Sequence, residues 1–411
     1  EYLLKKPEVK YLAEMMNWPG VLFNDKTVYE KLDIAKRLGK PIDGHAPGLR
    51  GEQAEQYIKA GISTDHECFT ADEARDKLKH GMKIAIREGS AAKNFEALVE
   101  LFSEAPDMLM FCSDDKHPDN LVEGHINQLV QRTLAKGHNL FDALTAACIT
   151  PIDHYNLDVG ALQQGDYADF ILVNNLEDFK VKATYINGEK VAENGKSHIK
   201  VQESQIINQF ECDPIETDAI RLKTESDQIK VIEALDGQLI TNCIESKCLV
   251  DADGFVQSDL AQDILKMVVV NRYQNTKPAI AFIKNFNLKE GAIASSVGHD
   301  SHNIIAVGVD DESICQAINL IIAEKGGVSA VTPKQEMILP LPVAGIMSNG
   351  DGYEIAESYT AIDKLTKEMG STLHSPFMTL SFMGLLVIPN LKLSDLGLFD
   401  GKEFKFTPLF L

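Results

Sequence analysis

Along the first 150 residues, short apolar runs alternate with longer segments in which apolar side chains recur every three or four positions. Short apolar runs are typical of buried strands, and the wider spacing is typical of amphipathic helices. Because elements that alternate in this way usually form a parallel sheet with helices outside it, the pattern predicts an α/β fold. Thr70 or Asp72 is expected to cap the third helix. The predicted strands lie within residues 9–15, 40–45, 61–66, 82–90 and 108–115, and the predicted helices within 26–39, 51–61, 70–81, 91–105 and 120–137.

The pattern changes to an α+β arrangement beyond about residue 200. A helix is expected within 311–327, with Asp310 or Asp311 as its cap and Gly326 at its end. We therefore predict three domains, which comprise a strand–helix domain (1–155), a small β domain (156–198) and an α+β C-terminal domain (199–411) that contributes to the active site. The further elements expected in the last domain are strands within 238–246, 264–273 and 278–286 and a helix within 354–370.

Acidic residues outnumber basic ones, 61 against 40, which gives a formal net charge of −21. This charge repels phosphate backbones and anionic membrane surfaces, so we expect neither nucleic acid nor a membrane as a partner. A neutral base or nucleoside remains possible as a substrate. The seven cysteines are dispersed without a Cys-x-x-Cys pair, which favours reduced thiols and a cytoplasmic location.

Titratable side chains stand where the predicted strands end. In parallel α/β folds, catalytic groups gather at the carboxyl ends of the strands, so these side chains are expected to converge. Imidazole and carboxylate ligands together suit Zn, Mn or Fe. A single histidine at a strand end is more often structural, but four ligand-type residues on successive strands favour a metal site. The strand-end residues are Glu14, His45, His66, Arg87, Glu88, Asp114 and Asp115.

Several motifs are similar to those of one known family over nearly the whole chain. The segment 159–175, "VGALQQGDYADFILVNN", is similar to the barrel exit of the amidohydrolase superfamily. The more specific motifs together resemble the adenine deaminases of that superfamily. These motifs are "EMMNWPGV" (14–21), "DGHAPGL" (43–49), "GISTDHE" (61–67), "CSDD" (112–115) and "GHDSHNI" (298–304).

The resemblance implies a (β/α)8 metal-dependent hydrolase barrel with a binuclear centre of Mn²⁺ or Fe²⁺, with Zn²⁺ also possible. It implies hydrolysis of adenine, a small purine base, to hypoxanthine and ammonia in purine salvage. Glu14, His45, His66 and Asp114 match the metal ligands, with Glu14 bridging the metals as an unmodified carboxylate. Asp114 matches the residue that moves protons to and from the attacking water, the role of a general acid and base.

One departure from the superfamily pattern concerns its first strand, which usually ends in a His-x-His pair. No such pair stands in a matching place, and Glu14 matches the fourth strand of the barrel. We therefore expect an incomplete barrel that lacks its N-terminal strands. An open barrel exposes strand edges, which is a liability unless another chain covers them. The chain is also expected to form a homo-oligomer of two or more copies.

Other residues are candidates for substrate binding. Glu67 is predicted to act in catalysis by accepting from the purine edge, with a structural role as the alternative. Asp65 is either a partner of an imidazole or a helix-capping or solvent-facing residue. The loop 298–304 is expected to reach over the barrel mouth, although a plain Asx-turn would also explain it. The predicted substrate-binding residues are Arg87, Glu88, His117, His299, Asp300 and His302, and an internal ion pair is the alternative for Arg87 and Glu88.

Two other functions remain open from the sequence. The chain would be another amidohydrolase if its substrate were guanine or a cyclic amide. It would be an inactive fragment for metal binding or assembly if the missing strands were essential.

Overall fold

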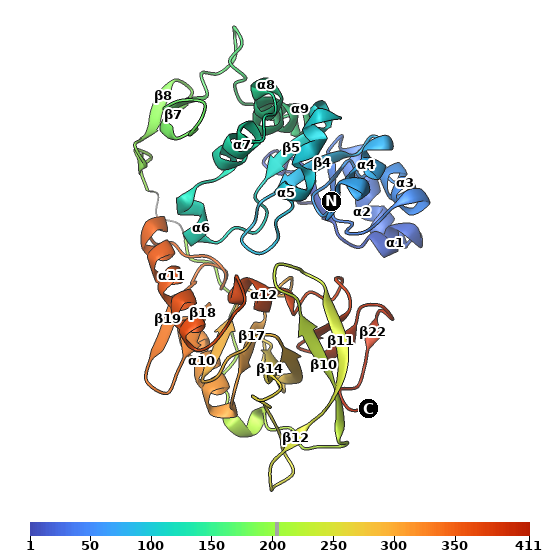
Figure 1. Cartoon of the computed structure of the whole chain (residues 1–411), viewed down its shortest axis with the longest axis vertical. Helices are drawn as coiled ribbons and strands as arrows, with labels where there is room; N and C mark the ends of the chain where they lie inside the picture. Colours follow the sequence, from blue (N-terminus) through green and yellow to red (C-terminus); the bar gives the residue numbers. More distant parts are fainter. Residues whose placement is uncertain (202–204) are drawn as a thin grey trace. The chain divides into compact units, whose positions relative to one another are not determined.

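The computed structural model describes residues 1–201 and 205–411, and these form two compact units (Figure 1). The first unit comprises Glu1–Gly89, Lys93–Lys116 and Glu123–Gln202. The second comprises Ser90–Ala92, His117–Val122 and Glu203–Leu411, so a short loop and most of one short helix from the strand–helix region group with the C-terminal part. This division into two units does not test the predicted domain boundaries near residues 155 and 198, which stay predictions.

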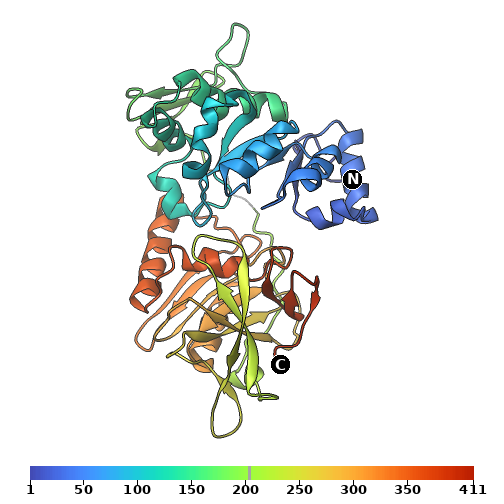
Figure 2. The ribbon, with the colours of Figure 1, turned by 45° about the vertical axis from the view of Figure 1, so that its right-hand side comes forward.

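Parallel strands follow one another in chain order through the first unit (Figure 2). β1 pairs with β2, and β3, β4 and β5 pair in that order, all in parallel. The N–H of Ser63 donates to the carbonyl of Ile42 (2.9 Å), which links the two groups of strands. The α/β prediction is confirmed. The strands are β1 (Leu12–Met15), β2 (Ile42–Gly44), β3 (Thr64–Asp65), β4 (Lys83–Arg87) and β5 (Leu109–Cys112).

Helices connect these strands, and the hydroxyl of Thr70 caps α4 by accepting from the N–H of Glu73 (3.2 Å). Two predicted helices are wrong in extent. Residues 91–105 form only α5 and a following 3₁₀ turn. Residues 120–137 divide into α6 and α7 at Gly124, whose φ of 154° lies outside the helical region. The helices are α1 (Trp18–Leu22), α2 (Lys26–Arg37), α3 (Gly51–Lys59), α4 (Ala71–Lys79), α5 (Phe95–Leu98), α6 (Pro118–Glu123), α7 (Ile126–Ala135), α8 (Leu140–Leu144) and α9 (Thr150–Tyr155), with 3₁₀ turns at Val99–Ser103 and Pro106–Met108 and a π turn at Thr145–Ile149.

The buried faces of these helices cover the strands. Leu32 of α2 and Tyr57 of α3 share one apolar cluster with Ile42 of β2, and Phe95 of α5 shares another with Ile84 of β4. The strand ends, which carry the titratable side chains, are therefore held by a packed layer of helices. An antiparallel sheet completes the unit with β6 (Phe170–Val173), β7 (Val181–Ile186), β8 (Glu189–Glu193) and β9 (Lys196–Ser197).

An eight-stranded sheet forms the centre of the second unit, in the order β11-β10-β15-β14-β17-β16-β18-β19. The pairing is antiparallel except between β10 and β15. The predicted α+β arrangement is confirmed. The strands are β10 (Gln228–Ala234), β11 (Thr241–Lys247), β14 (Ile264–Val270), β15 (Ala279–Lys284), β16 (Ala292–Ser295), β17 (Ile304–Gly308), β18 (Gly327–Val331) and β19 (Glu336–Pro340).

Helix α10 (Asp311–Glu324) packs on this sheet through side chains such as Ile314 and Ile318, which share a buried cluster with Ala294 and Ala306. Asp310 caps the helix by accepting from the N–H of Ser313 (2.7 Å). The remaining elements are α11 (Gly352–Glu368), α12 (Pro376–Phe382), a 3₁₀ turn (Thr217–Ala219), β12 (Leu249–Val250), β13 (Val256–Gln257), β20 (Leu391–Ser394), β21 (Gly397–Asp400) and β22 (Lys405–Phe406).

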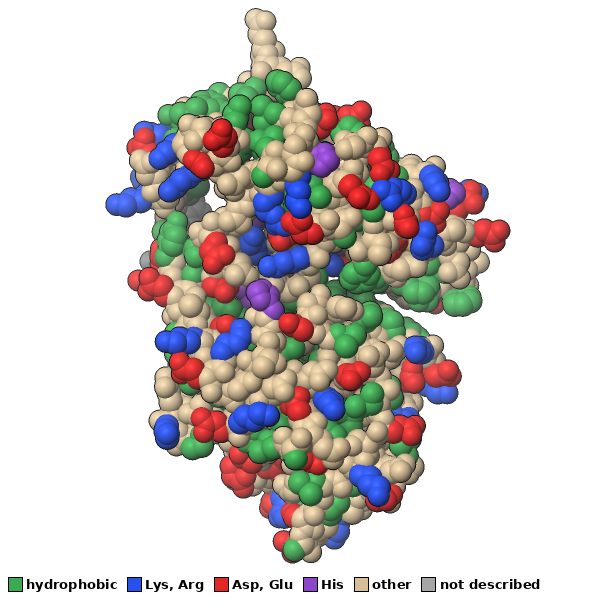
Figure 3. Space-filling view, viewed as in Figure 1, with side chains coloured by type: hydrophobic (Ala, Val, Ile, Leu, Met, Phe, Trp, Pro, Cys, Tyr) green, Lys and Arg blue, Asp and Glu red, His purple; other side chains and the backbone are tan. Residues whose placement is uncertain are grey.

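Acidic and basic side chains are interspersed over the face that Figure 3 shows, without a continuous basic patch on that face. In the part of the chain that the structure describes, no helix has both the length and the apolar character needed to cross a membrane.

Candidate metal centre

Three of the predicted ligands meet at the ends of the first three strands. Glu14 lies in β1, His45 directly follows β2, and His66 directly follows β3. The Oε2 atom of Glu14 lies 3.0 Å from Nε2 of His66 and 3.5 Å from Nδ1 of His45. The ligand atoms of all three residues lie within 4.8 Å of one another, which is close enough for one metal ion.

His45 is buried, and neither ring nitrogen has a hydrogen-bond partner among residues 1–201 and 205–411. Its Nδ1 atom lies 3.5 Å from carboxylate oxygens of Glu14 and Glu67, but neither contact has hydrogen-bond geometry. Buried polar groups in folded proteins nearly always have a partner. A buried imidazole that has no hydrogen-bond partner and faces two carboxylates is the arrangement expected of a metal ligand.

A second ligand group consists of His66, Glu67 and Asp114, and it shares His66 with the first. Arg87 joins the two carboxylates of this group. Its Nη2 atom donates to Oε2 of Glu67 (3.0 Å), and its Nη1 atom donates to Glu67 and to Oδ2 of Asp114 (2.6 Å). Asp114 has a φ of 54°, a strained conformation for a non-glycine residue that often marks a functional position.

The carboxylates of Glu14 and Glu67 are held in their ionised form. Burial raises the pKa of Glu14, but contacts with His45 and His66 outweigh burial and lower the pKa to about 2. Burial also raises the pKa of Glu67, and the opposing effects of His66, His45 and Arg87 lower it to about 2. Burial lowers the pKa of His66, but Glu14 and Glu67 outweigh burial and raise it well above its usual value, so a metal that binds there would displace the proton of this imidazole.

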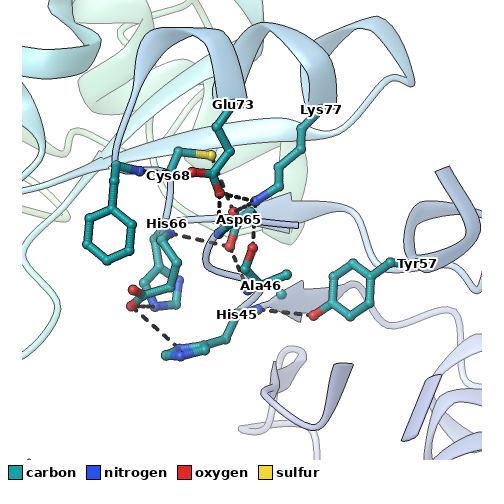
Figure 4. A network of polar contacts seen from close by, with 12 residues as sticks. His45, Ala46, Tyr57, Asp65, His66, Cys68, Glu73 and Lys77 are labelled. Carbon is teal, nitrogen blue, oxygen red and sulfur yellow. Dashed lines mark hydrogen bonds and ion pairs between the residues drawn. The ribbon is translucent and has the colours of Figure 1, made fainter. Parts of the chain in front are cut away.

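A buried network lies directly behind the two histidines (Figure 4). The Oδ1 atom of Asp65 accepts from the N–H groups of Ala46 (3.1 Å) and Glu67 (3.3 Å). The ammonium of Lys77 donates to Oδ2 of Asp65 (2.5 Å) and to the carbonyl of Ala46 (2.7 Å). Asp65 is fully buried and does not face solvent, and Thr70 rather than Asp65 caps α4. The contacts of Asp65 are to Lys77, to Cys68 and to the backbone beside the histidines.

Two further supports were not predicted from the sequence. The hydroxyl of Tyr57 accepts from the N–H of His45 (3.1 Å) and donates to the carbonyl of Met15 (2.5 Å). The side-chain amide of Asn94 donates to the carbonyl of His66 (3.0 Å). Neither residue belongs to a strand-end motif, and only their distance from the strand ends in three dimensions identifies them.

The structure does not bring every predicted residue to this cluster. The carboxylate of Glu88 pairs with Arg132 (2.9 Å). His117 belongs to the second unit, where its ring packs against Tyr359 with centroids 4.4 Å apart. Burial, with a smaller effect of His299, lowers the pKa of His117 to about 4, so its imidazole is neutral at physiological pH.

The loop between β16 and β17 carries His299, Asp300 and His302. The ring of His299 stacks on Phe382 (4.5 Å between centroids) and lies 5.7 Å from the ring of His302. The Nδ1 atom of His302 is buried and has no hydrogen-bond partner within the described ranges. This loop belongs to the second unit and the metal centre to the first, so the expected approach of the loop to the centre stays a prediction.

Comparison with known families agrees with this architecture. Residues 2–191 match the family model described as "Amidohydrolase family", and residues 238–405 match the one described as "Adenine deaminase C-terminal domain". The parallel strands with ligand residues at their ends therefore belong to an amidohydrolase domain. Membership of this family implies a metal centre, and the donor set and the orphaned imidazole of His45 fit one.

Curated relatives identify the family more closely. A protein of Salinibacter ruber named "Adenine deaminase" is 50% identical over 411 residues, which cover 100% of this chain and 75% of the relative. Proteins with the same name from Sulfurovum sp. (51% identical, covering 99% and 75%) and Methanosarcina acetivorans (49% identical, covering 99% and 76%) match similarly. The chain belongs to the adenine deaminase family.

Proposed function

We propose that this chain catalyses the hydrolytic deamination of adenine to hypoxanthine and ammonia. The observation that carries the proposal is the convergence of Glu14, His45 and His66 at three successive strand ends, in a chain of this family. Asp114 lies in the adjoining ligand group.

Glu14, His45, His66 and Asp114 are the proposed metal ligands. The two ligand groups share His66, which supports a binuclear centre. Nitrogen and carboxylate donors suit Mn²⁺ or Fe²⁺, and Zn²⁺ is also compatible with them. Bound there, a divalent metal would supply a nucleophile at neutral pH by lowering the pKa of a water molecule toward ~7.

Asp114 is the proposed proton carrier. Arg87 fixes one of its oxygens at 2.6 Å, while its side chain stays 29% exposed and therefore accessible to water and substrate. A carboxylate in this position can accept the proton of the attacking water and return it to a ring nitrogen or to the leaving ammonia.

Glu67 is better suited to holding the centre than to contacting the purine. Its side chain is fully buried, Arg87 binds both of its oxygens, and Oε1 also lies 3.4 Å from His66. We therefore assign it a role in positioning the imidazoles and Asp114. For purine recognition we propose the loop with His299, Asp300 and His302, together with His117 and, less directly, Arg87 and Glu88. A cytoplasmic homo-oligomer that acts in purine salvage completes the proposal.

The test compares the metal-loaded chain with its Asp114→Asn variant. The parent should release ammonia from adenine in preference to guanine or dihydroorotate. The variant keeps the shape of the side chain but loses the proton acceptor, so turnover should fall at least ~10²-fold. Near-parental turnover of the variant would exclude the assigned role, and a preference for guanine or dihydroorotate would overturn the proposed substrate.

The metal assignment has its own measurement. His45→Ala removes one ligand nitrogen and little apolar volume, so metal content should fall while the fold is retained. Unchanged metal stoichiometry, measured by elemental analysis of protein purified without chelators, would place the metal elsewhere.

A further inference from the structure

A third group of ligand-type residues, Asp65, Cys68 and Glu73, lies beside the proposed metal centre, with its ligand atoms within 4.8 Å of one another. This group already holds a cation, because the ammonium of Lys77 lies 2.5 Å from Oδ2 of Asp65 and 2.8 Å from Oε1 of Glu73. Lys77, Asp65 and Glu73 are at most 4% exposed. The group is therefore an internal ion cluster of the protein and not a further metal site.

The two carboxylates of this cluster each connect the two histidine-bearing loops. Asp65 binds the N–H groups of Ala46 and Glu67, which directly follow His45 and His66. Glu73 accepts from the N–H of Gly48 (2.8 Å) in the first loop and from the N–H of Phe69 (3.2 Å) in the second.

Lys77 completes the connection between the loops. Its ammonium binds both carboxylates and the carbonyl of Ala46 (2.7 Å), so all three of its bonds serve groups that hold these loops. Figure 4 shows the lysine reaching from its helix to the point between the loops. Buried ions of this kind seldom stabilise a fold more than apolar packing would. Their value here lies in fixing two backbone segments at a defined separation.

We propose that Lys77 is a positioning residue of the metal centre, and that it sets the separation of His45 and His66 through Asp65 and Glu73. The inference rests on the proposed metal centre. Groups that orient metal ligands without touching the metal typically change metal affinity 10–100-fold when they are lost. An effect of that size separates a positioning role from general stabilisation.

The experiment uses Lys77→Met in the full chain and measures the dissociation constant of Mn²⁺ by equilibrium dialysis. We expect the dissociation constant to rise about 10–100-fold, with an unchanged KM for adenine when metal is saturating. Lys266→Met is the matched control. Lys266 is equally buried and pairs with Asp311 in the second unit, so its loss should destabilise the fold without changing Mn²⁺ affinity.

Glu73→Gln is a second variant in case Lys77→Met does not fold, because it removes one charge and no volume. A folded Lys77→Met or Glu73→Gln chain with parental Mn²⁺ affinity would overturn the inference. So would an equal loss of affinity in Lys266→Met, which would indicate general destabilisation. If the parent binds Mn²⁺ but does not turn over adenine, the proposed reaction fails, and weaker Mn²⁺ binding by Lys77→Met would still support the positioning role.

Discussion

Replacing Arg87 by methionine tests whether the guanidinium neutralises the buried carboxylate of Glu67 and the more exposed one of Asp114. Arg87 is 2% exposed and binds Glu67 and Asp114. Removing one partner of a buried ion pair leaves an uncompensated charge and costs about 3–5 kcal/mol. We therefore expect the metal-free Arg87→Met chain to lose about 3 kcal/mol of stability.

Trp18 makes this loss measurable in the first unit. It is the only tryptophan of the chain and lies in α1, so its fluorescence reports on the unit that holds Arg87. With a urea m-value of about 2 kcal/mol/M, a loss of about 3 kcal/mol lowers the unfolding midpoint by about 1.5 M.

Lys136→Met is the control, since Lys136 pairs with Glu96 at the surface (2.6 Å, side chains 48% and 62% exposed). Surface pairs contribute about 0–1 kcal/mol, so its midpoint should stay within about 0.5 M of the parent. A parental midpoint for Arg87→Met would refute the reasoning. It would show that the buried carboxylate of Glu67 does not need the guanidinium of Arg87.

Two other predictions concern buried polar groups. Tyr57→Phe leaves the N–H of His45 and the carbonyl of Met15 without their partner, so stability should fall by about 1–3 kcal/mol in the same urea assay; an unchanged midpoint would mean that water replaces the hydroxyl. Burial lowers the pKa of Lys392 to about 7, so above pH 7 the unfolded chain, with an ordinary lysine, binds one proton more than the folded chain. The stability of the parent should therefore rise between pH 7 and about 10 by up to about 1.4 kcal/mol per pH unit. Calorimetry should show that Lys392→Met lacks this rise. Identical pH profiles for the parent and the variant would contradict the shifted pKa.

The positions of the ligand-type residues could be predicted from the sequence because the strand pattern fixes them. In a parallel sheet the carboxyl ends of successive strands meet at one edge, so residues that directly follow apolar runs must converge there. His45 and His66 follow this rule, Glu14 lies near the end of its strand, and the structure places the ligand atoms of all three within 4.8 Å of one another. Asp114 also follows it, and it adjoins them through His66 and Glu67.

The residues that support the ligands could not be predicted in this way. Helix α4 carries Lys77 and Lys79 two positions apart, and hydropathy does not distinguish them. The structure buries Lys77 beside Asp65 and leaves Lys79 exposed, because the side of the helix that carries Glu73 and Lys77 faces the histidine loops. From the amphipathic pattern alone, a lysine on the inward side of a helix is not expected to be buried, because the residues that pair with it are not visible in that pattern.

The chemistry of the metal-centre residues limits what they can recognise. The ionised carboxylates of Glu14 and Glu67 only accept hydrogen bonds. Adenine presents acceptors such as N7 as well as donors such as its N6 amino group, so carboxylates can bind only its donor groups. The terminal nitrogens of Arg87 are paired with carboxylates and its Nε is buried, so the cluster offers no accessible guanidinium donor. Donors for the acceptor nitrogens of adenine would therefore have to come from groups other than this guanidinium.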